Sequence, residues 1–162
     1  MLFRSAGRRN TLSFFTFYGN QRTLQRPGGI VFRNCRVRNV DKLMHYNFSG
    51  NERWQSGEPL SGVVFENVVA DGLKQPSVAY GIAKVPLVLT LKGCSLAFSG
   101  KVPEVFRGAF VGRAEIDELE VRGVDGPLFR MWSDGPDVSE GGTGLGLPVS
   151  EKGTGDFDAK PI

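Results

Sequence analysis

The chain has 162 residues, a length that fits a single domain. An apolar content of 40% can supply a core, and 22 glycines favour a turn-rich, all-β chain over a helical one. No apolar run is long enough to cross a bilayer, so a membrane-spanning helix is excluded and no membrane partner is expected.

The amino-terminal end is strongly basic. Eight arginines and no acidic residue precede Asp41, although the net charge of the whole chain is only +3. Such a block is typical of nucleic-acid contact, an anionic surface or a targeting peptide, and equally of a solvated β surface, which we favour. No nucleic-acid motif accompanies it, so no nucleic-acid partner is expected. Residues 1–27 give no clean repeat and are predicted to be a ragged amino-terminal segment.

From residue 28 onward one pattern recurs: apolar, any, apolar, any, Asn or Gly, then Cys or Val. Its four copies span residues 30–35, 63–68, 89–94 and 119–124. The copies start 33, 26 and 30 residues apart, which lies inside the range of roughly 20 to 50 residues that marks solenoids and arrays.

Each position of the pattern has a physical meaning. Alternation with a period of two puts the first and third residues on one face of a strand and the second and fourth on the other. The Asn or Gly that follows tolerates a left-handed backbone, so the strand bends there and a second short strand continues. Strand, left-handed corner and strand make up one coil of a β-helix.

The sequence therefore predicts an all-β chain folded as a right-handed, single-stranded parallel β-helix of about four coils over residues 28–132. The four copies should stack in parallel with Phe32, Phe65, Leu91 and Val121 in one inward column. A β-sandwich whose strands share the alternation is the alternative, and the repeated corner argues against it. Residues 133–162 are Gly-rich and are predicted to be a flexible tail.

The longest interruption of the pattern, residues 45–58, is predicted to be a loop and a candidate sugar-binding site. Its aromatic side chains offer flat apolar faces, and its Arg and His side chains suit the carboxylate of a uronic acid. The expected partner is therefore an acidic polysaccharide or oligosaccharide. The alternative is that the loop covers the coil, with Trp54 as its anchor. The candidate contact residues are His45, Tyr46, Asn47, Arg53, Trp54 and Gln55.

Cysteine and histidine are too few for a metal centre. The chain has Cys35, Cys94 and the single histidine His45, whereas a structural zinc site takes four ligands. We expect no metal and no cofactor. The two cysteines hold the same place in copies one and three, so about 9–10 Å should separate them, too far for a disulfide.

Three phrases of the repeat resemble the carboxy-terminal coils of glycoside hydrolase family 28, the polygalacturonases and related pectin-degrading enzymes. They are GIVFRNC at residues 29–35, VVFENV at 63–68 and LKGCSL at 91–96. The family's catalytic motifs are Asn-x-Asp, Asp-Asp, Gly-His-Gly and Arg-x-Lys. This chain has a single Asn-x-Asp, at residues 39–41, and none of the other three, so no catalytic residue is carried over.

The resemblance implies the carboxy-terminal β-helix portion of a pectin- or polysaccharide-active protein, with the remainder of a longer β-helix as its partner. Its parent would be secreted or periplasmic, although no signal peptide is seen in the sequence. The chain has no complete catalytic site of its own by this comparison, so enzymatic activity stays an open question. The alternative function is a non-catalytic β-helix module for carbohydrate binding, adhesion or surface and spike assembly.

Overall fold

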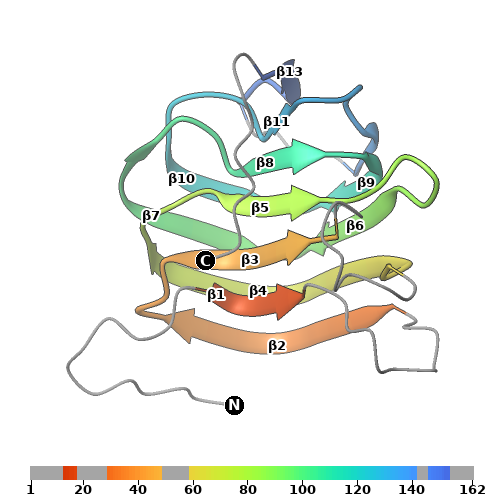
Figure 1. Ribbon diagram of the computed structural model, residues 1–162. Coiled ribbons are helices and arrows are strands. Elements are labelled where there is room, and N and C mark those ends of the chain that lie inside the picture. Colours follow the sequence, from red (N-terminus) through yellow and green to blue (C-terminus); the bar gives the residue numbers. More distant parts are fainter. Residues whose placement is uncertain (1–12, 18–28, 49–58, 142–145, 154–162) are drawn as a thin grey trace.

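The computed structural model describes residues 13–17, 29–48, 59–141 and 146–153, and every regular element in these ranges is a β-strand (Figure 1). The strands are β1 (Ser13–Phe17), β2 (Ile30–Arg38), β3 (Lys42–Asn47), β4 (Gly62–Leu73), β5 (Ser77–Tyr80), β6 (Leu87–Lys92), β7 (Ser95–Val102), β8 (Phe106–Ala109), β9 (Val111–Asp117), β10 (Glu120–Val124), β11 (Phe129–Met131), β12 (Asp137–Gly141) and β13 (Ser150–Lys152).

The strands form two sheets in which neighbouring strands are parallel. Sheet A has six strands in the order β1-β3-β5-β8-β11-β13. Sheet B has seven, in the order β10-β7-β4-β6-β9-β12, with β2 paired to β4. The chain alternates between the sheets, so each coil contributes to both. In Figure 1 sheet A runs left to right in front and β2 runs back behind it while the coils rise, which makes the winding right-handed. The predicted parallel β-helix is confirmed.

The predicted corners of the first three copies are present. Asn34, Asn67 and Gly93 have φ angles of 56°, 51° and 60°, in the left-handed region. The Asn67 Nδ2 atom donates a hydrogen bond to the Asn34 Oδ1 atom at 3.2 Å, so the side chains at the first two corners also pair along the stack. The left-handed backbone and the hydrogen bond between stacked side chains both explain why the pattern has Asn at the corner.

The prediction that Val121 joins the Phe32 column is wrong. The fourth copy of the sequence pattern, residues 119–124, begins after the corner that stacks on the first three. Strand register places Ile116 beside Leu91, whereas Val121 lies beside Leu96 on the next face of the coil. The corner itself is at Glu118, with a φ of 49°. The sequence pattern matched Gly123 instead, which has a φ of 80° and lies inside β10, where the pairing with β7 shifts register.

Aromatic side chains stack along the core. The Phe32 and Phe65 rings of sheet B lie 5.3 Å apart at an interplanar angle of 15°. The Phe106 and Phe129 rings of sheet A lie 5.3 Å apart at 22°. Fully burying each such ring contributes roughly 1.5–3 kcal/mol, so equivalent positions of successive coils share one continuous core.

Paired strands extend beyond residues 28–132 at both ends. Strand β1 pairs with β3, β12 with β9 and β13 with β11. Sheet A consequently has six levels where about four coils were predicted. Among the described residues, no helix is long and apolar enough to cross a membrane.

The arginines of β2 lie on a solvated surface. Arg33 forms an ion pair with Glu66 on the adjacent strand, and the Arg38 Nε atom lies 3.9 Å from an Asp71 carboxylate oxygen. Both arginine side chains are more than half exposed. This agrees with the surface interpretation of the basic block for the part of it that the structure describes.

Candidate functional site

The outer face of sheet A carries two adjacent columns of side chains that form the candidate site. In the first, His45, Val78, Arg107, Arg130 and Glu151 lie side by side on successive strands. Side chains of a strand alternate between its faces, and the neighbours of His45, Arg107 and Arg130 along their strands are buried in the core: Tyr46, Phe106, Phe129 and Met131. The first column therefore points away from the core.

The second column lies two residues further along each strand. Asn47 pairs in register with Tyr80, and Tyr80 with Ala109. Trp132 follows β11 directly and its backbone N–H donates to the Gly108 carbonyl at 2.8 Å, which places it beside Ala109. Two strand spacings, about 10 Å, therefore separate Tyr80 from Trp132. Both aromatic side chains are half-buried.

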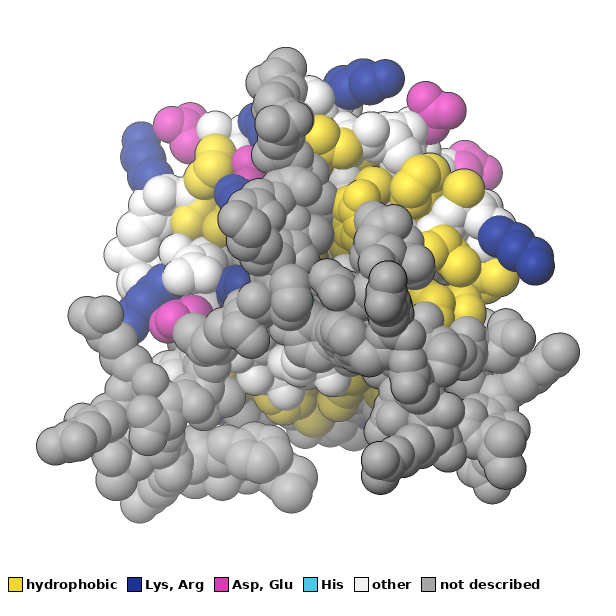
Figure 2. Space-filling view, viewed as in Figure 1, with side chains coloured by type: hydrophobic (Ala, Val, Ile, Leu, Met, Phe, Trp, Pro, Cys, Tyr) yellow, Lys and Arg dark blue, Asp and Glu magenta, His cyan; other side chains and the backbone are white. Residues whose placement is uncertain are grey.

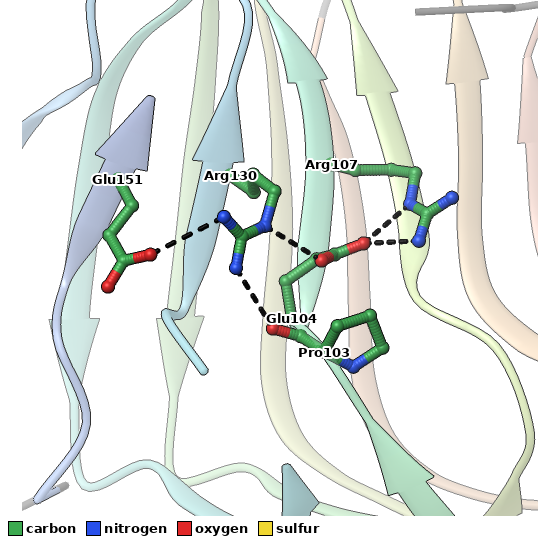
Figure 3. A network of polar contacts seen from close by, with 5 residues as sticks. All are labelled: Pro103, Glu104, Arg107, Arg130 and Glu151. Atoms are coloured by element: carbon green, nitrogen blue, oxygen red, sulfur yellow. Dashed lines mark hydrogen bonds and ion pairs between the residues drawn. The ribbon is translucent and has the colours of Figure 1, made fainter. Parts of the chain in front are cut away.

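A buried carboxylate holds the arginines of the first column (Figure 3). Glu104, in the turn before β8, is 2% exposed. Its Oε1 atom accepts from two nitrogens of Arg107, and its Oε2 atom accepts from the Arg130 Nε atom at 3.0 Å. Arg130 also lies 3.4 Å from a Glu151 carboxylate oxygen. Two guanidinium groups are thus fixed on neighbouring strands by one carboxylate.

At the other end of this face a buried lysine meets the histidine. The Lys42 Nζ atom lies 3.2 Å from the His45 Nδ1 atom, and the two residues are 9% and 4% exposed. Burial, and then the nearby Lys42 charge, lower the pKa of His45 to about 4. Burial, followed by the Arg107 charge, also lowers the pKa of Lys42, while Asp41 acts in the opposite sense. The imidazole is consequently neutral at pH 7.

The predicted site residues are divided by the structure. His45, Tyr46 and Asn47 belong to strand β3 and are buried, instead of starting a loop. Tyr46 lies in the core with 0% exposure, and this burial raises the pKa of its phenol. Arg53, Trp54 and Gln55 lie outside the described residues.

Sequence reasoning missed four residues of this face: Tyr80, Arg107, Arg130 and Trp132. A signal for two of them was present, because Phe106-Arg107 and Phe129-Arg130 repeat the same aromatic–arginine pair on adjacent strands. The repeated corner motif lies in sheet B, so it carries no signal for the shorter strands of sheet A.

Figure 2 shows this face of the molecule from the same side as Figure 1. Hydrophobic side chains gather over the region where β5 and β8 end, and charged side chains lie on both sides of this view.

Comparisons with known proteins return no match: no family model, no curated protein and no solved structure is similar to the chain. Of the properties that the sequence resemblance implies, the structure supports the architecture, an all-β chain with two parallel sheets. Within the described residues, no group of three or more His, Cys, Asp or Glu side chains is placed to hold a metal ion.

Proposed function

We propose that the chain is a non-catalytic β-helix module that binds an acidic oligosaccharide across the outer face of sheet A. The observation that carries this proposal is the pair of columns, with Arg107 and Arg130 beside the aromatic column of Tyr80 and Trp132. Both columns cross several strands, so the ligand would lie perpendicular to the strands.

The two columns offer the two contacts that an acidic sugar needs. Aromatic rings pack against the apolar face of a sugar ring, and their polar tips reach hydroxyl groups. A guanidinium group has five N–H donors and matches a carboxylate in a bidentate geometry. Arg107 uses only its Nε and one terminal nitrogen on Glu104, so further N–H groups remain for a ligand.

The hydrogen bonds that Glu104 accepts favour binding over hydrolysis as the function of this face. Glycoside hydrolysis normally takes two carboxyl groups that flank the scissile bond. Glu104 is the only buried carboxylate among the described residues, and both of its oxygens already accept hydrogen bonds from arginines.

The β-helix portion of a pectin-active glycoside hydrolase is the second candidate. The phrases that resemble family 28 lie on stacked strand–corner–strand segments, at Asn34, Asn67 and Gly93. A β-helix with such corners contains similar phrases for structural reasons alone.

Calorimetric titration of the purified chain with oligogalacturonides tests the proposal. We expect measurable binding, and about tenfold weaker binding for Tyr80→Ala or Arg107→Gln, which corresponds to about 1.4 kcal/mol. Arg122→Ala, an exposed change on sheet B, is the matched control and should leave the affinity unchanged.

Two results would contradict the proposal. One is the absence of binding to both acidic and neutral oligosaccharides at millimolar concentration. The other is production of new reducing ends from polygalacturonate that tracks the purified protein, which would favour the hydrolase.

A further inference from the structure

Lys42 is unusual among the positively charged residues of the chain. It is the only buried Lys or Arg within the described residues, at 9% exposure. Its side-chain partner is the His45 Nδ1 atom at 3.2 Å, which is a neutral group. A buried ammonium without a counter-ion is costly, because burial removes its hydration and nothing replaces it.

The acidic groups around Lys42 are directed to other cations. Asp41, its chain neighbour, has a carboxylate oxygen 3.7 Å from the Lys74 Nζ atom. Glu104 accepts from Arg107 and Arg130. In the part of the chain that the structure describes, no carboxylate lies within ion-pair distance of Lys42. Arg107, on β8, adds a like charge that disfavours protonation of the amine.

We propose that Lys42 is a nucleophilic amine that forms an imine with a small carbonyl compound carrying a carboxylate group. Desolvation together with a neighbouring cation is one of the ways in which lysine is activated as a nucleophile. The low exposure of Lys42 limits the carbonyl compound to a small one, and Arg107 attracts its carboxylate.

The neighbouring imidazole completes the chemistry. The Nζ lone pair attacks the carbonyl carbon, and the amine passes a proton to the His45 Nδ1 atom, with the imidazole in its Nε2–H tautomer. The imidazole returns this proton to the alkoxide oxygen left by the opened C=O bond, which gives the neutral carbinolamine. A second proton from Nζ passes by the same route to the hydroxyl group as the C–O bond breaks. Water leaves, and the C=N bond of the imine forms with atoms and charge in balance.

Reductive trapping on the wild-type chain is the experiment. Glyoxylate with sodium cyanoborohydride converts each imine into a stable carboxymethyl-lysine, and peptide mass spectrometry gives the rate at each lysine. Lys84 and Lys101 are exposed and serve as internal references. At pH 7.5 an ordinary lysine is a free amine in only about one molecule per thousand.

At pH 7.5 we expect Lys42 to be labelled at least tenfold faster than Lys84 and Lys101. The ratio should fall toward one or below at pH 10.5, where about half of the exposed amines are deprotonated. In urea all lysines should react alike. His45→Gln should slow labelling of Lys42 several-fold without affecting Lys84, and Lys84→Arg should leave Lys42 unaffected.

If Lys42 were buried without being activated, it should be labelled more slowly than the exposed lysines Lys84 and Lys101 at pH 7.5. If Lys42 in the folded wild-type chain is labelled at the rate of Lys84 or more slowly at pH 7.5, the proposal is overturned, whatever the variants do. The result is independent of saccharide binding, so each proposal can fail while the other stands.

Discussion

Glu104 organises the outer face of sheet A at the scale of a single residue. One buried carboxylate accepts from arginines on two neighbouring strands, and Arg130 reaches on to Glu151 of a third. The Arg130 terminal nitrogen also lies 3.5 Å from the Pro103 carbonyl oxygen, beside Glu104 itself. These contacts fix both the turn before β8 and the direction of the two guanidinium groups.

Replacing Glu104 with Gln should therefore destabilise the protein. The amide keeps the shape but leaves two guanidinium groups without their carboxylate, a loss of about 3–5 kcal/mol for a fully buried pair. The Arg107 and Arg130 side chains are 38% and 27% exposed, so water replaces part of the lost interaction. We therefore expect the free energy of unfolding to fall by about 2 kcal/mol. Thermal unfolding should show a Tm lower by about 4–8 °C.

Glu120→Gln is the matched control for this substitution. Its ion pair with Arg122 joins side chains that are 71% and 74% exposed, so its loss should cost less than about 0.5 kcal/mol. Equal Tm changes for the two variants would mean that the Glu104 network is no stronger than a surface pair.

At the scale of the elements, two strands of sheet A lie so close together that one position between them admits only glycine. Gly108 of β8 lies against Ala79 of β5, and a Cβ atom added to it would come within 1.9 Å of the Ala79 carbonyl oxygen. The obstacle is backbone on the neighbouring strand, which a rotamer change cannot move. The β5–β8 pairing and the Tyr80–Ala109 contact of the outer face depend on this approach.

Gly108→Ala should consequently force β5 and β8 apart. We expect a loss of about 3 kcal/mol or more in the free energy of unfolding, measured by urea denaturation. Gly100→Ala is the control, since a Cβ atom there has no atom within 4 Å and should change stability by less than about 0.5 kcal/mol. Similar unfolding midpoints for the two variants would show that the strands are not packed as described.

At the scale of the whole molecule, the stacking of successive coils determines how deeply each of the two cysteines is buried. Both thiols are free, but they are not equally buried. Cys35 is half-buried on the terminal strand β2, where it lies beside Val68. Cys94 is 2% exposed inside the stack, and its Sγ atom donates to the Phe65 carbonyl oxygen at 3.3 Å. Of the two thiols, only that of Cys94 is therefore buried inside the stack.

The thiols should therefore react in two steps. Burial raises the pKa of Cys94, which reduces its thiolate fraction as well as its access to reagent. With a thiol-specific reagent at pH 8, we expect Cys35 to react in the native protein and Cys94 only after unfolding. Cys35→Ser should leave one thiol that appears only in denaturant, and Cys94→Ser one that reacts without it. A Cys35–Cys94 disulfide would contradict the stacking order.

The sequence by itself determined the repeating unit of this protein. Alternation, the left-handed residues Asn34, Asn67 and Gly93, and the short strand after each corner are properties of contiguous residues. Backbone sterics and side-chain direction act within a few residues, so the printed order of amino acids is enough to predict strand, corner and strand. Parallel stacking then followed, because each coil can bury its apolar face only against the next.

Only the tertiary structure decided the register and the candidate surface. The corner residues are 33, 26 and 25 positions apart, and Glu118 takes a place that the pattern reserved for Asn or Gly. With coils of unequal length, hydrogen-bond pairing alone fixes which residues of sheet A become neighbours. It brings Arg107 beside Arg130 and Tyr80 near Trp132, and it buries Tyr46 in the core. A cross-strand column joins residues more than 20 positions apart, and no local pattern contains that information.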